Sequence, residues 1–213
     1  MAAKIFIIGL PRSGTTSLCY ALLEQGIATA HTAYTNTTFA NATALADTPI
    51  FNDYQTLDNH YPDAKFIYLQ RELHAWIPSI RQLLERMYTN LTRSDGGFNS
   101  HIKRCFLNVF PDLSGANIND DGYLAQCYEN HFNTAKDYFK QRQADFLVID
   151  ISHAASYQQM CKFLMISSSE GQFVKMNAGG KVTAWNDIKH PLKIASTRNG
   201  KIDKSLNYAQ KIL

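Results

Sequence analysis

Residues 4–16 have the sequence KIFIIGLPRSGTT, and this stretch decides which fold the chain predicts. Its first part, residues 4–9, is a short run rich in β-branched side chains, which is typical of a buried strand. A loop of Gly, Pro, Arg and hydroxyl residues follows, and residues 15–24 then show the apolar spacing of a helix that stops at Gly26. A loop between a strand and a helix can bind phosphate through its backbone N–H groups and the positive end of the helix dipole.

The loop keeps the glycine spacing of the nucleoside triphosphate loop GxxxxGK[ST] but lacks its lysine. Thr15 stands where the lysine would be, and the cation is Arg12, inside the loop. Gly9 and Gly14 allow tight turns, while Thr15 and Thr16 add hydroxyl donors. The loop therefore predicts an anion site whose charge comes from an arginine.

Strand-like and helix-like segments alternate along the chain, except in residues 34–48, which are small and polar with no clear periodicity. We expect further strands at 28–32, 64–70 and 145–150, and helices at 54–59, 77–87, 101–110, 123–139 and 157–164. Apolar residues with helical spacing extend over 73–87, but we expect the helix to begin at 77, because proline at 78 is tolerated in a first turn. This alternation predicts an α/β fold of three layers, P-loop NTPase-like, with a central parallel sheet and helices on both faces. In such sheets ligands bind at the carboxyl ends of the strands.

The composition fits a single domain over residues 1–213. The 213 residues are 45% hydrophobic, enough for one sizeable core. Residues 91–121 are rich in Gly, Asn and Ser and are interpreted as an insertion on the acceptor side. The net charge of +3 is scattered, so no nucleic acid is expected as a partner.

The same sequence argues against a membrane or metal protein. No apolar run approaches the length of a membrane span, and no secretory signal is recognised. The four cysteines have no CxxC pairing, which favours a reduced, cytoplasmic protein: Cys19, Cys105, Cys127 and Cys161. No metal is expected, because no His/Cys cluster has ligand spacing and the strand at 64–70 is followed by Arg71 rather than by a magnesium-binding Asp.

The loop resembles that of the sulfotransferases that use 3′-phosphoadenosine 5′-phosphosulfate (PAPS). In that family a loop of the form xPRSGTT or xPKSGTT holds the 5′-phosphosulfate, and GLPRSGTT is similar to the arginine form, typical of the bacterial and Golgi-type branches. The resemblance implies that the donor is bound by six loop residues: Pro11, Arg12, Ser13, Gly14, Thr15 and Thr16.

Two further elements of the family have counterparts here. A strand followed by an Arg, with a Ser eight positions later, holds the 3′-phosphate of PAPS in the family, and Arg71 and Ser79 have this spacing. Arg offers a planar fork of donors to a phosphate, and Ser79 lies near an expected helix start. A late loop, NAGGKVTAWN, is similar to the family's Gly- and Lys-containing loop and implies donor contacts from Gly180, Lys181 and Trp185. It departs from the family at 186, where an Asn stands in place of a frequent Lys.

Sulfuryl transfer suits these residues chemically. The sulfuryl group carries less charge than a terminal phosphoryl group, so fixed donors can replace a metal. Arg12 stays protonated and is assigned an electrostatic role. The acceptor must lose a proton to a general base, for which His31, Asp47 and Asp53 all remain candidates. His31 has a pKa suited to neutral pH, whereas either Asp could instead be a turn or cap residue.

The resemblance thus predicts a sulfotransferase that moves a sulfuryl group from PAPS to a hydroxyl or amine. The acceptor, a small molecule, sugar or peptide, and the oligomeric state are left open by the sequence. Two alternatives also stay open: a P-loop small-molecule kinase, and a non-catalytic nucleotide-binding member of the fold.

Overall fold

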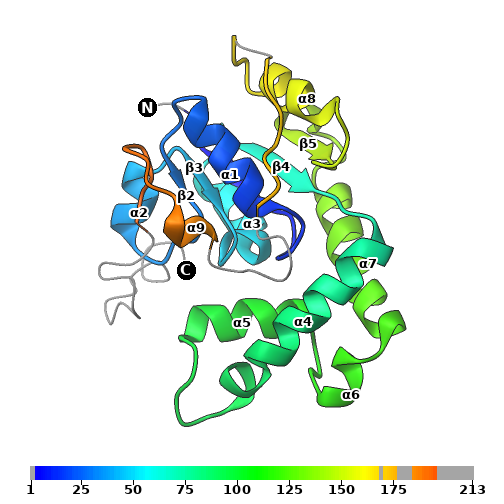
Figure 1. The fold of residues 1–213 in the computed structure, drawn as a ribbon. Helices are drawn as coiled ribbons and strands as arrows, with labels where there is room; N and C mark the ends of the chain where they lie inside the picture. The colour runs from blue at the N-terminus through cyan, green and yellow to red at the C-terminus, as the bar shows by residue number, and fades with distance from the viewer. Residues whose placement is uncertain (1–2, 168–169, 177–183, 196–213) are drawn as a thin grey trace.

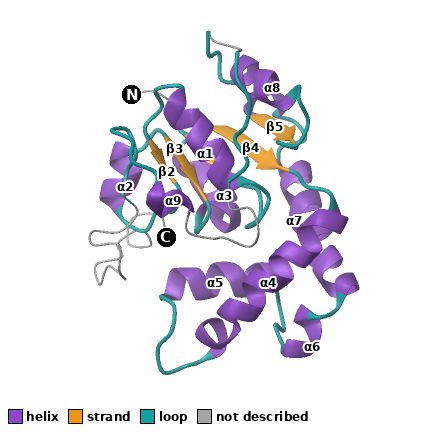
Figure 2. Cartoon of the chain, in the orientation of Figure 1, coloured by secondary structure: helices purple, strands orange, loops and turns teal. Residues whose placement is uncertain are grey.

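The computed structural model describes residues 3–167, 170–176 and 184–195. Its centre is a parallel sheet, for which five strands are described, in the order β2-β3-β1-β4-β5 (Figures 1 and 2). The strands are β1 Ile5–Ile7, β2 Thr29–Ala30, β3 Ala44–Ala46, β4 Lys65–Leu69 and β5 Phe146–Ile149. The helices are α1 Thr15–Glu24, α2 Asn36–Asn41, α3 Ile50–His60, α4 Leu73–Thr92, α5 Ser100–Val109, α6 Gly115–Ile118, α7 Asp121–Tyr138, α8 Ser156–Phe163 and α9 Ala184–Asp187, with a 3₁₀ turn η1 at Gln143–Asp145.

Alternating side chains of the strands bury both faces of the sheet. On one face, Phe6 of β1 and Phe66 of β4 pack with residues of α2, α3 and α7. On the other face, Ile7 of β1 and Ile67 of β4 pack with residues of α1 and α8. The predicted α/β fold, with a central parallel sheet covered by helices on both faces, is therefore confirmed.

A third apolar cluster lies beyond the carboxyl end of β1. Leu10, just after β1, shares this cluster with Trp76 of α4, Phe106 of α5 and Leu124 of α7. Figure 1 shows α4, α5 and α6 gathered below the sheet, with α7 running from them back to it. Residues 91–121, expected as an insertion, contribute the end of α4 together with α5 and α6. Their assignment to the acceptor side stays a prediction.

The start of α4 differs from the prediction. We expected a start at 77, but α4 begins at Leu73 and carries Pro78 in its second turn. Trp76 explains the difference, because its fully buried indole donates from Nε1 to the Pro11 carbonyl at 3.0 Å and fixes the first turn. Pro78 removes only the N–H that would have bonded to the His74 carbonyl, so packing outweighs the proline penalty.

The segment without clear periodicity also contains regular structure. It holds α2 and the short strand β3, which pairs with both β1 and β2. β3 consists of Ala44, Leu45 and Ala46, which have little strand preference of their own and become a strand by pairing within the sheet. The expected strand at 28–32 is present as β2, and α3 begins at Ile50, four residues earlier than expected.

Candidate active site

The loop between β1 and α1 has a backbone shape that requires its glycines. Gly14 has φ +107°, in the left-handed region, and a Cβ built on it would lie 2.3 Å from Cδ1 of Ile151. Arg12 also has positive φ, at 71°. Ser13 holds the turn by donating from its N–H (3.1 Å) and its hydroxyl (2.6 Å) to the Leu10 carbonyl. No side chain caps α1, so the N–H groups of its first turn face the loop without partners inside the helix.

A cavity of about 760 Å³ opens over this loop and the start of α1. Its walls come from segments that follow four strands, namely β2, β3, β4 and β5, and from α4, α5 and residues 173–176. The cavity therefore lies at the carboxyl edge of the sheet, where parallel sheets bind ligands.

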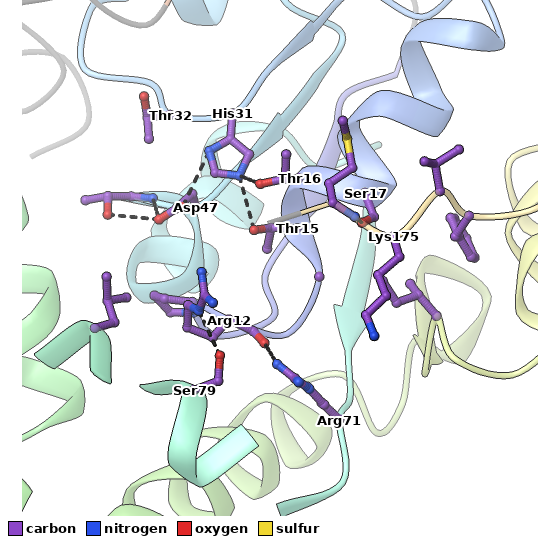
Figure 3. A pocket seen from close by; sticks show the side chains of 18 of the residues that line it. Arg12, Thr15, Thr16, Ser17, His31, Thr32, Asp47, Arg71, Ser79 and Lys175 are labelled. Carbon is purple, nitrogen blue, oxygen red and sulfur yellow. Dashed lines mark hydrogen bonds and ion pairs between the residues drawn. The ribbon is translucent and has the colours of Figure 1, made fainter. Parts of the chain in front are cut away.

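Arg71 and Ser79, which the family resemblance predicts as ligands of the 3′-phosphate, both contact the loop. Ser79 Oγ accepts from Arg12 Nε at 2.9 Å, and Arg71 donates from Nη1 to the Arg12 carbonyl at 2.6 Å (Figure 3). The Arg71 backbone N–H donates to the Tyr128 hydroxyl at 2.8 Å, which fixes the chain where it leaves β4. Burial, followed by the charges of Arg71 and Arg86, lowers the pKa of Arg12. Two guanidinium groups thus concentrate positive charge at one end of the cavity, as an anion site requires.

His31 and Asp47, treated in the sequence as rival bases, form a pair. The Nδ1 atom of His31 lies 3.5 Å from Oδ2 of Asp47, and its Nε2 atom lies 3.2 Å from the Thr15 hydroxyl and 2.9 Å from the Thr16 hydroxyl (Figure 3). Asp47 is held by Thr48, whose N–H donates to Oδ1 at 2.8 Å. The pair forms because His31 follows β2 and Asp47 follows β3, and these strands are neighbours in the sheet.

The surroundings of His31 favour its neutral form. Burial lowers the pKa of His31; the charge of Asp47 opposes this shift, and that of Lys193 adds to it. A neutral imidazole with Asp47 at Nδ1 can accept a proton at Nε2.

Asp53, the third candidate base, lies elsewhere. Both of its carboxylate oxygens accept from Arg104, at 2.6 Å each, in a two-pronged ion pair between α3 and α5. It is not among the described residues that line the cavity. The geometry gives Asp53 a structural role in joining two helices.

The late loop is only partly described. Gly180 and Lys181 lie outside the described residues. Trp185, in α9, stacks on His31 with ring centroids 5.4 Å apart and an angle of 30° between the planes. The Lys193 ammonium lies over the same Trp185 ring, 5.2 Å from its centre. Trp185 therefore supports the imidazole and is not among the described residues that line the cavity.

Sequence reasoning missed one cation of the cavity, Lys175. Its segment crosses α1, where the Met176 N–H donates to the Ser17 hydroxyl at 3.2 Å, and Phe173 packs edge-on against Tyr157. Within the described residues, Lys175 makes no hydrogen bond or ion pair, and its side chain lines the cavity. The only signal in the sequence was a lone lysine in a polar stretch, which nothing distinguishes from a surface lysine.

Other classes of site are not found in the described part of the chain. There is no group of three or more His, Cys, Asp or Glu side chains that could hold a metal. None of the described helices is both long enough and apolar enough to cross a membrane. All four cysteines are free and buried.

Comparison with protein families decides the assignment. A family model described as a sulfotransferase domain matches residues 32–182, more than two thirds of the chain. The chain belongs to the sulfotransferase-domain family. A search of curated proteins found no match. The family match begins after the loop at 9–16, so the loop and the match are separate observations on this sulfotransferase, and they agree.

Proposed function

We propose that this sulfotransferase takes its sulfuryl group from PAPS and transfers it to an acceptor hydroxyl or amine without a metal. The observation that carries the proposal is a single cavity that joins the uncapped start of α1 with Arg12, Arg71 and Lys175 and with the His31–Asp47 pair. Anion binding and proton acceptance are the two capacities that sulfuryl transfer requires.

The donor fits the cavity chemically, because it carries two separate anionic groups. The 5′-phosphosulfate would take the N–H groups of the loop and of the first turn of α1, at the place where Gly14 leaves no room for a side chain. The 3′-phosphate would take Arg71 and Ser79. We add Lys175 to this set, because it is a cation on the cavity wall with no acidic partner among the described residues.

The residues have distinct roles in the transfer. The bond between sulfur and the bridging phosphate oxygen breaks as the acceptor oxygen or nitrogen bonds to sulfur, and the leaving phosphate keeps the electron pair. Arg12 and the loop N–H groups stabilise the charge that grows on this phosphate. Thr15 and Thr16 direct hydroxyl donors at the sulfuryl oxygens. The acceptor proton passes to Nε2 of His31, and Asp47 holds the ring and stabilises the imidazolium.

In this assignment, the bound donor also frees the proposed base to accept a proton. The Thr15 and Thr16 hydroxyls lie within hydrogen-bond distance of Nε2 of His31, the atom that must accept the proton. A bound phosphosulfate would draw these hydroxyls to its own oxygens and leave Nε2 open to the acceptor. The donor is therefore expected to bind before the acceptor.

The proposal includes a cytoplasmic location, supported by the four free cysteines, since unpaired cysteines are typical of reducing compartments. The kinase and the non-catalytic alternatives have no specific observation in their favour.

Turnover tests the proposed function. The protein is incubated with PAPS and a panel of acceptor alcohols, phenols and amines, with EDTA present, and the release of adenosine 3′,5′-bisphosphate is followed together with the mass of the acceptor. Acceptor-dependent release supports the proposal. Consumption of ATP that depends on magnesium would instead favour the kinase, and donor binding without transfer to any acceptor would favour the non-catalytic alternative.

A further inference from the structure

The cavity has two chemically different sides. Figure 3 shows His31 and Asp47 well separated from Arg71 and Lys175. The side with Arg71 and Lys175 carries the positive charge that an anionic nucleotide needs. The other side is open to a second ligand next to the proposed base.

The wall near the base is built from two helix faces. Along α4, Ser79, Leu83 and Met87 follow one another at intervals of four residues, so they lie on one face of the helix. Ser79 contacts the loop through Arg12, and the two apolar residues continue the same face away from it. On α5, Ile102 and Phe106 are also four residues apart, and both line the cavity. Among the described residues of α4 and α5 that line the cavity, none beyond Ser79 is polar.

Apart from Asp47 and from Arg12, which donates to Ser79, the remaining lining residues on this side are uncharged. Thr32, Tyr34 and Thr48 line the cavity beside the base. Tyr34 is buried, and burial raises the pKa of its phenol, so it stays neutral. Its ring stacks on His101, with centroids 6.5 Å apart, which fixes it in place.

From these walls we infer that the acceptor is a small apolar alcohol or phenol held between α4 and α5 with its hydroxyl at His31. The inference rests on the proposed function and specifies its substrate class. An apolar body gains from contact with Leu83, Met87 and Phe106, and its single hydroxyl finds its partner in the His31–Asp47 pair.

A sugar or a peptide fits this side less well. Each of their polar groups would lose water against an apolar wall and would need a new partner to avoid an uncompensated cost. The volume points the same way, because about 760 Å³ has to hold the nucleotide donor and the acceptor together, and pockets of roughly 300–1,000 Å³ commonly hold one drug-sized ligand.

Calorimetric titration of the bisphosphate-saturated protein tests this inference. The probes are 2-naphthol and 1-octanol, with glucosamine and a short tyrosine-containing peptide for comparison. We expect both apolar probes to bind more tightly than the polar ones. The double variant Leu83→Gln/Met87→Gln should weaken the apolar probes at least tenfold, while the affinity for adenosine 3′,5′-bisphosphate stays unchanged.

Leu107→Gln is the matched control. Leu107 follows Phe106 on α5, is 37% exposed and is not among the described residues that line the cavity, so its substitution should leave every probe unaffected. Tighter binding of glucosamine or the peptide, or apolar binding that the double variant does not change, would overturn the inference while bisphosphate binding upholds the proposed function. Absence of bisphosphate binding would overturn both.

Discussion

The pKa of His31 sets the pH range in which its ring can accept a proton. Burial lowers this pKa from its ordinary value of 6.5. The neutral ring is the active form of a base, so kcat/KM should be constant above pH 6.5 and fall as the pH drops through the lowered pKa. An aliphatic alcohol is the acceptor for this profile, because it does not titrate in the range. Since the charge of Asp47 raises the His31 pKa, Asp47→Asn should move the acidic limb to still lower pH. A limb that lies above pH 6.5 would contradict this assignment.

Substitution separates the three acidic and basic candidates. His31→Gln removes the proton acceptor and should lower kcat by about 10²- to 10⁴-fold, with little change in affinity for adenosine 3′,5′-bisphosphate. Asp53→Asn is the comparison, because its carboxylate pairs with Arg104 outside the cavity. It should retain kcat and lower only the free energy of unfolding. A loss of kcat in Asp53→Asn that equals the loss in His31→Gln would reverse the assignment.

Lys175 is expected to contribute charge to the donor site. Lys175→Met keeps much of the side-chain length and should raise the Kd for adenosine 3′,5′-bisphosphate about tenfold, which corresponds to about 1.4 kcal/mol. Lys162→Met, an exposed position on α8, is the control and should have no effect on this Kd. Calorimetry at two salt concentrations checks the prediction, because an ionic contact weakens with salt. Equal Kd values for wild type and Lys175→Met would remove this lysine from the site.

At the scale of elements, the junction of β1 and α1 depends on Gly14. Its φ of +107° is strained for any L-residue, and a Cβ would meet Ile151. Gly14→Ala should therefore destabilise the fold by about 1–3 kcal/mol and weaken bisphosphate binding. Gly26→Ala tests strain alone, since Gly26 has φ +77° with nothing within 4 Å of its added Cβ. It should cost about 1–2 kcal/mol and leave binding intact. Calorimetry and urea unfolding measure both, and unaltered binding in Gly14→Ala would contradict the role of the loop.

His131 joins α7 to the sheet and to α3. Its Nε2 donates to the Phe51 carbonyl at 2.8 Å, so Nδ1 is the acceptor for the Tyr68 hydroxyl at 3.0 Å. Burial lowers the pKa of His131 from 6.5 to about 4. Between these values the unfolded chain binds more protons than the folded one. This contribution to stability is therefore complete above pH 6.5 and is lost as the pH falls to 4, by about 3 kcal/mol.

Urea unfolding from pH 7 to pH 4 measures this effect as a difference between two proteins. His131→Gln should show a shallower decline in the free energy of unfolding than the wild type, because carboxylates titrate alike in both. Parallel declines would show that His131 does not have a lowered pKa.

The helices and strands also show which element bounds local sequence patterns can predict. The bounds of α1 were predicted as found, because its apolar spacing and its stop at Gly26 are local signals. The start of α4 was not, because the packing of Trp76 against Pro11 is a contact across 65 residues. β3 was missed for the same reason: its three residues, with little strand preference of their own, become a strand only by pairing with β1 and β2.

The same distinction applies to the candidate site. Arg71 and Ser79 were predicted from the resemblance to the family's 3′-phosphate element, and both contact the loop in the structure. That His31 and Asp47 lie next to each other could not be predicted, because their proximity depends on the unrecognised strand β3. Lys175 lies in a stretch without periodicity, and only the path of the chain over α1 brings it to the cavity.

At the scale of the whole molecule, the sheet and the helices below it contribute different parts of the cavity. The loop, α1 and the ends of β2, β3 and β4 position the proposed anion site and the proposed base. The helices α4 and α5 add the apolar wall of the cavity. The two parts share the cavity, so a change of acceptor would require changes in α4 and α5 and none in the loop. Because of this arrangement, we expect substitutions in the loop to change the affinity for the donor, and substitutions in α4 and α5 to change the affinity for the acceptor.

The most direct test of the proposed donor is a calorimetric titration with adenosine 3′,5′-bisphosphate, repeated with ATP and magnesium. Wild type, Arg71→Ala and Arg93→Ala are compared. Arg93 is an exposed arginine that pairs with Asp95 on the surface, and it controls for the loss of one charge. We predict that the wild type binds the bisphosphate tightly and binds ATP with magnesium more weakly. Arg71→Ala should weaken bisphosphate binding at least tenfold, and Arg93→Ala should leave it unchanged. A preference for ATP with magnesium, or equal bisphosphate affinity in all three proteins, would contradict the PAPS-dependent mechanism.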